Sequence, residues 1–247
     1  MSEMIYGVHT VRAVLQKDPS NIFEVLLQDS RDRNQRINEI EALANQNNIP
    51  IRYLPRRQLD DLVDGARHQG VIAQSRGMTS LDEAFLENLI SQQAHAPLLL
   101  ILDGIQDPHN LGACLRTADA VGVDAVIAPK DKSVGLTPVV RKTAVGAAET
   151  IPFVQVTNLA RTIKRLQELG VWISGASANA DQTLYDLDFT GASAIVIGAE
   201  GKGLRRLTEE HCDYLMKIPM QGSVESLNAS VAAAVCLFEA RRQRLTK

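Results

Sequence analysis

The sequence of 247 residues has few cysteines, no long apolar run and no strong excess of charge. Its three cysteines, Cys114, Cys212 and Cys236, form no C-x-x-C pair, and no histidine stands near them at metal-ligand spacing. That pattern supports neither a disulfide framework nor a zinc site. The longest apolar stretch, Pro97–Leu102, is too short to cross a bilayer, and Met1–Gly7 lacks the basic segment of a signal peptide. We therefore expect a reduced cytoplasmic protein with no metal and no membrane partner.

The net charge is small, at −3, with an isoelectric point near 6.0. This argues against a protein that coats nucleic acid indiscriminately, but RNA binding stays open because affinity depends on where the charge sits. Residues 1–80 carry ten Lys/Arg and ten Asp/Glu. Their arginines gather in two groups: Arg31, Arg33 and Arg36, then Arg52, Arg56, Arg57 and Arg67. From charge alone, these groups indicate a solvated surface.

Residues 1–75 have the pattern of a small domain in which helices and strands alternate. The expected helices are Gly7–Gln16, Arg33–Gln46 and Arg56–Val63, and the expected strands are Ile22–Leu27, Ile51–Tyr53 and Gly70–Ala73. Residues 76–96 are polar and Gln-rich at their end, so we expect a linker with no more than a short helix near Leu81–Leu89.

Residues 97–247 predict a second α/β domain built on a mostly parallel sheet. The continuous apolar run Leu98–Leu102 is typical of a strand buried on both faces. Further strands are expected at Ala125–Ala128, Ile151–Val156, Val171–Ala176, Ala194–Ile197 and Met216–Ile218. Helices are expected at Gly112–Val121, Pro138–Ala148, Leu159–Leu169 and Leu227–Arg242. In the last helix, Leu227, Val231, Ala234 and Phe238 share one face, which we expect to pack on the sheet.

Three polar loops follow apolar strands in this second domain, and ligands of parallel sheets bind where the strands end. They are residues 103–112, which lead into a helix with Arg116, residues 198–203, and residues 219–228. Each candidate has a simpler explanation: Asn110 and Ser226 as helix caps, Arg116 as a surface arginine, Glu200 as a turn acid. Because three such loops occur together, a ligand site is favoured.

The common cofactor fingerprints are absent. No G-x-G-x-x-G follows an early strand, and the Walker A and G-x-S-x-G patterns do not occur. Motif logic alone therefore reaches an α/β enzyme whose ligand site lies late in the chain.

At these loops the sequence resembles the SPOUT class of methyltransferases, in its TrmH-type RNA 2'-O-ribose branch. Asn110 and Arg116 match the first motif, Ile195–Leu204 the second, and Ile218–Met220 with Ser226–Ser230 the third. The resemblance extends to the small domain through Tyr6–His9 and His68–Val71. Within the branch, the full-length match is to enzymes that methylate a guanosine of large-subunit rRNA.

The resemblance implies a small RNA-binding domain like a ribosomal protein, and a catalytic domain threaded into a deep trefoil knot. It also implies a homodimer that acts on large-subunit rRNA with S-adenosylmethionine as methyl donor. If the matching positions have the same roles as in the family, backbone near Gly198, Ile218 and Leu227 would contact the donor. Catalysis would then centre on Arg116, Asn110, Glu200, Ser226 and Asn228.

The reaction requires a ribose 2'-hydroxyl to become nucleophilic, through a base or through stabilisation of the alkoxide. A guanidinium normally stays protonated, so we expect Arg116 to act as a cation, with Glu200 fixing it. The three other polar side chains would orient groups by hydrogen bonds. Two alternatives stay open: a tRNA ribose methyltransferase of the same branch, and a non-catalytic RNA-binding assembly factor.

Overall fold

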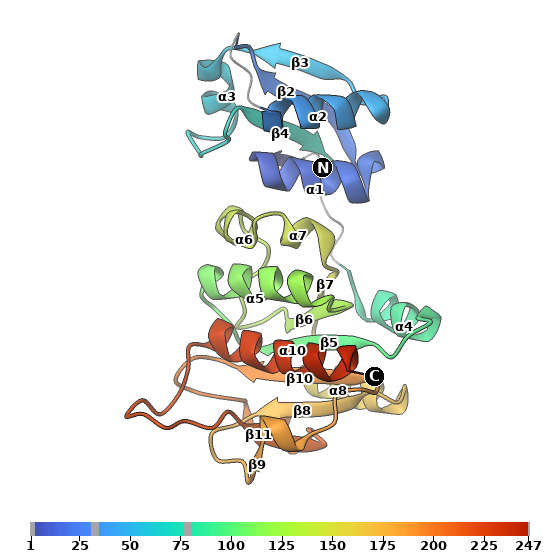
Figure 1. Cartoon of the computed structure of the whole chain (residues 1–247), viewed down its shortest axis with the longest axis vertical. Coiled ribbons are helices and arrows are strands. Elements are labelled where there is room, and N and C mark those ends of the chain that lie inside the picture. Colours follow the sequence, from blue (N-terminus) through green and yellow to red (C-terminus); the bar gives the residue numbers. More distant parts are fainter. Residues whose placement is uncertain (1–2, 31–34, 77–80, 247) are drawn as a thin grey trace. The chain divides into compact units, whose positions relative to one another are not determined.

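The computed structural model describes residues 3–30, 35–76 and 81–246. Arg31 and Arg33, and the expected start of the second helix, lie outside these ranges. The chain divides into two compact units, residues 1–79 with 145–150 and residues 80–144 with 151–247 (Figure 1). Both units have the α/β character that the sequence predicts.

The first unit is built on a four-stranded sheet of order β1-β4-β2-β3. Strand β4 is antiparallel to β1 and β2, whereas β2 and β3 are parallel. Strand β1 was not expected from the sequence. The elements are β1 (Glu3–Tyr6), α1 (Val8–Lys17), η1 (Pro19–Asn21), β2 (Ile22–Gln28), α2 (Gln35–Gln46), β3 (Ile51–Leu54), α3 (Arg56–Leu62) and β4 (Val71–Ser75).

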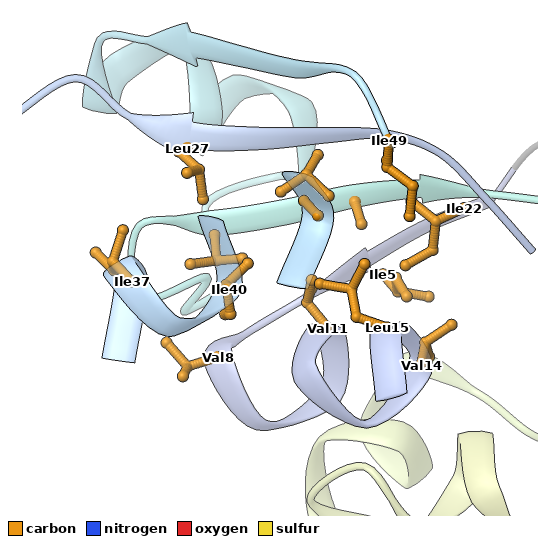
Figure 2. Packing of buried hydrophobic residues seen from close by; sticks show 14 residues of the cluster. Ile5, Val8, Val11, Val14, Leu15, Ile22, Leu27, Ile37, Ile40 and Ile49 are labelled. Carbon is orange, nitrogen blue, oxygen red and sulfur yellow. The ribbon is translucent and has the colours of Figure 1, made fainter. Parts of the chain in front are cut away.

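Apolar residues on one side of α1 and α2 hold these helices against the sheet. Val8, Val11 and Leu15 recur at helical spacing and are buried, as Figure 2 shows from close by. They meet sheet residues such as Leu27, while a smaller cluster around Leu59 of α3 covers the other face. The sheet is therefore covered on both sides.

The second unit is built on a seven-stranded sheet of order β7-β6-β5-β10-β8-β11-β9, in which every pairing is parallel. This confirms the predicted sheet. The elements are α4 (Glu83–Gln92), β5 (Leu98–Asp103), α5 (Pro108–Val121), β6 (Ala125–Pro129), α6 (Pro138–Ala144), β7 (Phe153–Val156), α8 (Leu159–Glu168), β8 (Trp172–Ala176), β9 (Gln182–Thr183), η2 (Leu184–Asp186), β10 (Ser193–Gly198), α9 (Arg206–Glu210), β11 (Tyr214–Lys217) and α10 (Ala229–Leu245). The trefoil knot stays a prediction.

All six residues of the central strand β5 are buried, because helices cover both faces of the sheet. Side chains alternate between the faces of a strand, so Leu99 and Ile101 join one cluster with residues of α4 and α8. Helix α10 packs against β10 and α5 (Figure 1). Helix α4 lies within the expected linker, and its Leu86 is buried in the same cluster as Ile101.

Two helices differ from their expected form. The segment Pro138–Ala148 is not one helix: α6 ends at Ala144, and a second helix, α7 (Ala147–Thr150), follows. Val145 and Gly146 between them have φ of 54° and 95°, which an α-helix does not accommodate.

The predicted packing face of α10 was wrong. Val231 and Phe238 are exposed, at 47% and 55%, whereas Ala233, Cys236 and Ala240 are buried. Both faces of this helix are apolar, so periodicity could not choose between them. The buried face also includes Leu237, so side-chain size does not distinguish the faces either.

Candidate active site

The three loops start at one edge of the second unit's sheet. In the parallel pairing of β5 with β10, Asp103 lies opposite Gly198, so the first two loops leave the sheet side by side. The third loop follows β11, which pairs in parallel with β8. Polar residues up to 118 positions apart in the sequence are thereby brought together.

Two asparagines and one glutamate from the three loops form a hydrogen-bonded cluster. Asn110 Nδ2 donates to Glu200 Oε2 at 3.2 Å. Asn228 Nδ2 lies 3.0 Å from Asn110 Oδ1 and 3.2 Å from Glu200 Oε2, and it donates toward both. Asn110 is buried, at 8% exposure, whereas Glu200 is exposed. One carboxylate oxygen is therefore held by two amide groups and the other is left toward solvent.

The simpler explanations of the two cap candidates do not hold. Asp107 caps α5 by accepting from the His109 N–H at 2.9 Å, so Asn110 lies inside the helix. Asn228 caps α10, because its Oδ1 accepts from the Ser230 N–H at 3.0 Å. Ser226 is exposed and makes no hydrogen bond within the described part of the chain.

The second loop folds back on itself tightly. Ala199 and Gly203 exchange two backbone hydrogen bonds, of 3.1 and 2.9 Å. A methyl group on Gly198 would lie 2.2 Å from the carbonyl carbon of Gly203, far inside van der Waals contact. Glycine is required at 198 because the returning backbone passes over it.

A cavity of about 410 Å³ opens beside this cluster. Its walls include the three residues singled out for cofactor binding, Gly198, Ile218 and Leu227, together with Glu200 and Ser226. The volume falls in the range of small-molecule sites. The end of β8 and the loop that follows it, residues 176–179, also line the cavity, and this loop was not among the three expected from the sequence. Its position after an apolar strand was the available signal.

Arg116 lies apart from the cluster. It follows Asn110 by six residues on α5, which places it about 9 Å further along the axis and about 120° around the helix. The side chain is exposed and has no hydrogen bond or ion pair among the described residues. In this structure Glu200 is bound by Asn110 and Asn228 rather than by the arginine.

Burial makes two thiols of the second unit poor nucleophiles. Burial raises the pKa of Cys212 to about 12, and the carboxylates of Asp213, Glu209 and Asp103 add to the shift. Burial raises the pKa of Cys114, on α5, to about 12 as well. Both therefore stay protonated near neutral pH, and a protonated thiol is a poor nucleophile.

Neither a metal-binding cluster nor a membrane-spanning helix occurs in residues 3–30, 35–76 and 81–246. Within these ranges, no three His, Cys, Asp or Glu side chains are grouped closely enough to hold a metal ion. No helix in the described part of the chain is long and apolar enough to span a membrane.

Comparison with known families accounts for both units. Residues 97–238 match the SpoU rRNA Methylase family, and residues 4–78 match the RNA 2'-O ribose methyltransferase substrate binding domain. The chain belongs to the SpoU rRNA methylase family. SpoU relatives with nearly full-length similarity include the 23S rRNA (guanosine-2'-O-)-methyltransferase RlmB of Pseudomonas putida, 54% identical over 99% of this chain and 98% of the relative. The RlmB of Escherichia coli K12 is 52% identical over 99% of this chain and 100% of its own length.

Solved structures of SpoU proteins share the fold. The SpoU methyltransferase AviRb from Streptomyces viridochromogenes, in complex with AdoMet, superposes with a TM-score of 0.81 at 24% identity, over 100% of this chain and 92% of that one. The TrmH/SpoU tRNA modifying enzyme of A. aeolicus matches with a TM-score of 0.57 at 27% identity, over 66% of this chain and 84% of its own.

Proposed function

We propose that the chain transfers a methyl group from S-adenosylmethionine to the ribose 2'-hydroxyl of a guanosine in 23S rRNA. The similarity to the RlmB enzymes over nearly the whole of both chains carries this proposal. The cluster of Asn110, Glu200 and Asn228 supports it, because an assembly factor that only binds RNA has no need of such a constellation.

The cavity beside the cluster suits S-adenosylmethionine. Apolar side chains such as Ile197 and Leu227 offer contacts for an adenine ring, and Glu200, Glu209 and Glu225 suit a sulfonium cation. When bound, the donor supplies an electrophilic methyl group. We propose that backbone groups near Gly198, Ile218 and Leu227 hold it.

We assign the activation of the ribose hydroxyl to the catalytic set Arg116, Asn110, Glu200, Ser226 and Asn228. Arg116 keeps an unpaired, charged guanidinium, which would lower the pKa of the hydroxyl and stabilise the alkoxide as the hydroxyl proton passes to solvent water. The oxygen–methyl bond would form as the sulfur–methyl bond of the sulfonium breaks, which leaves a neutral thioether. The two asparagines fix Glu200, whose second oxygen stays available to accept a hydrogen bond. Ser226 lines the cavity with an unengaged hydroxyl.

Transfer of labelled methyl groups to unmodified 23S rRNA and tRNA transcripts tests the reaction. We expect label only in 23S rRNA, at one guanosine ribose. Arg116→Ala should bind S-adenosylmethionine like the parent but turn over about a hundred- to a thousand-fold more slowly. Arg116→Lys should recover part of the rate if charge is what matters. Parent-like single-turnover rates in the alanine variant would make Arg116 a surface arginine.

We propose that residues 1–75 select the RNA, beside a linker at 76–96 and a methyltransferase domain at 97–247. Arg57 and Arg67 are exposed and have no ion pair among the described residues, so they are available to phosphates. Reversing both charges should weaken RNA binding and flatten its salt dependence. Lys164→Glu, on α8 of the other unit, is the control. If the double charge reversal and Lys164→Glu lose equal RNA affinity, this assignment is contradicted.

We further propose a homodimer in the cytoplasm. Val231, Phe238 and Leu245 on α10 are exposed at 47%, 55% and 67%, and their spacing of seven places them on one face. Such an exposed apolar stripe is typical of an interface. Phe238→Glu should give a monomer in sedimentation velocity, whereas Tyr185→Glu, an exposed aromatic off the stripe, should not. If the Phe238→Glu variant is still a dimer, the stripe is not part of the interface.

A further inference from the structure

The last residue of the central strand β5 is a fully buried carboxylate. Asp103 has no exposed surface, yet it ends a strand whose other five residues are all apolar. A buried charge is costly unless it is paired and hydrogen-bonded. Its partner comes from a distant part of the chain: Asp103 Oδ2 accepts from the backbone N–H of Arg205 at 2.9 Å.

The guanidinium of Arg205 completes the pairing. Its Nε donates to Asp103 Oδ1, and its terminal amino group forms an ion pair with the same oxygen. The arginine side chain is 43% exposed while the carboxylate is not exposed at all. Such a pair is weak support for stability, because burying the carboxylate offsets much of the attraction. Its position in the chain indicates another role.

Asp103 lies beside both ends of the second loop, next to one through strand pairing and bound to the other through its side chain. At the start of the loop, Gly198 lies opposite Asp103 in the β5–β10 register. At its end, Arg205 is bound to that same residue. The six residues between them carry Glu200 and line the cavity from Ala199 to Leu204. A loop that starts in the sheet beside Asp103 and ends bound to its buried side chain keeps its backbone fixed before a ligand arrives.

We infer that Asp103 and Arg205 are positioning residues that hold the second loop in the shape that binds S-adenosylmethionine. The inference rests on the proposed donor pocket. Neither residue lines the cavity: Asp103 is fully buried, and Arg205 acts through the backbone that it anchors. Loss of the guanidinium leaves the backbone hydrogen bond in place, so the loop loosens without unfolding the sheet.

The test compares neighbouring arginines in the full-length protein. Arg206 is exposed and pairs with Glu210 one turn along α9, so Arg206→Ala is a matched control. Arg205→Ala should raise the Kd and the KM for S-adenosylmethionine roughly tenfold to a hundredfold, since a hydrogen bond to a charged group is lost. The KM for RNA should stay near that of the parent, whereas the melting temperature should fall because the buried Asp103 carboxylate loses its charged partner. Binding is therefore measured well below the melting temperature of each variant. Arg205→Lys should recover part of the affinity.

A second readout separates positioning from general stability. Amide hydrogen exchange of residues 199–204 should accelerate in Arg205→Ala by more than that of the strands of the sheet, and it should not accelerate in Arg206→Ala. The inference is overturned if Arg205→Ala binds S-adenosylmethionine as tightly as Arg206→Ala. A parent protein that binds the donor but methylates no rRNA would refute the proposed reaction, while the comparison of Kd values would still decide the role of the pair.

Discussion

Replacing Gly198 with alanine puts a methyl group where the second loop returns over the end of β10. The added carbon would lie 2.2 Å from the carbonyl carbon of Gly203 and 2.5 Å from the Leu204 nitrogen. Restoring an ordinary contact near 3.4 Å moves that backbone by about 1.2 Å. Backbone cannot rotate out of the way as a long side chain can, so the two hydrogen bonds between Ala199 and Gly203 are strained or broken.

The energy of this change sets the expected loss of binding. Overpacking costs about 1–3 kcal/mol, and each weakened hydrogen bond adds about 1 kcal/mol. If the variant loop needs about 2 kcal/mol to return to the conformation that binds the donor, the Kd for S-adenosylmethionine rises roughly thirtyfold. Gly198→Val should lose more affinity than Gly198→Ala. Both should lose more affinity than Glu200→Gln, which keeps an acceptor for the two asparagines.

Calorimetric titration with S-adenosylmethionine measures these changes. Gly222→Ala is the control in the third loop, because a methyl group there meets no atom within 4 Å. We expect it to bind like the parent. If Gly198→Ala also binds like the parent, or if Glu200→Gln loses more affinity than Gly198→Val, the loop does not form the donor pocket as argued.

Two further predictions concern stability and thiol chemistry. Arg244 donates to the backbone carbonyls of Phe189, Ala96, Pro97 and Gly191, at 2.6–3.1 Å, so Arg244→Ala should lower the free energy of unfolding by about 2–4 kcal/mol in urea. The exposed neighbour Arg241→Ala should change it by less than about 0.5 kcal/mol, and equal losses would refute the anchoring role. Burial raises the pKa of all three cysteines to about 12, whereas unfolded thiols ionise near pH 8.5. The free energy of unfolding should therefore fall as pH rises from about 8.5 toward 12. Iodoacetamide at pH 8 should label the thiols only after unfolding, and rapid labelling of the native protein would contradict this.

The order of elements could be predicted because the apolar pattern is unambiguous where a strand is central. Leu98–Leu102 has no polar residue, and the structure buries all of it at the middle of the sheet. The short strands β1 and β9 were missed because each is too short to carry a periodic signal. The face of α10 was missed for the opposite reason, since Val231 and Ala233 are both apolar and only packing distinguishes them.

The candidate site was predictable in composition but not in pairing. Loops after parallel strands meet at one edge, so Asn110, Glu200 and Asn228 were expected to lie close together. No sequence rule gives Glu200 two asparagine partners in place of an arginine, because hydrogen-bond partners depend on where each helix starts. The break between α6 and α7 was hidden for a similar reason, since Val145 takes a positive φ that β-branched residues rarely adopt.

Asn228 shows why a structural role and a functional one need not compete. Its Oδ1 caps α10 by accepting from Ser230, while its Nδ2 donates toward Asn110 and Glu200. An aspartate could make the cap but would bring a second negative charge beside Glu200, and a serine lacks a second group to donate in that direction. The start of the last helix and the position of the glutamate are thereby set by one side chain. A helix cap that needs both a donor and an acceptor is a sign that something other than the helix is being positioned.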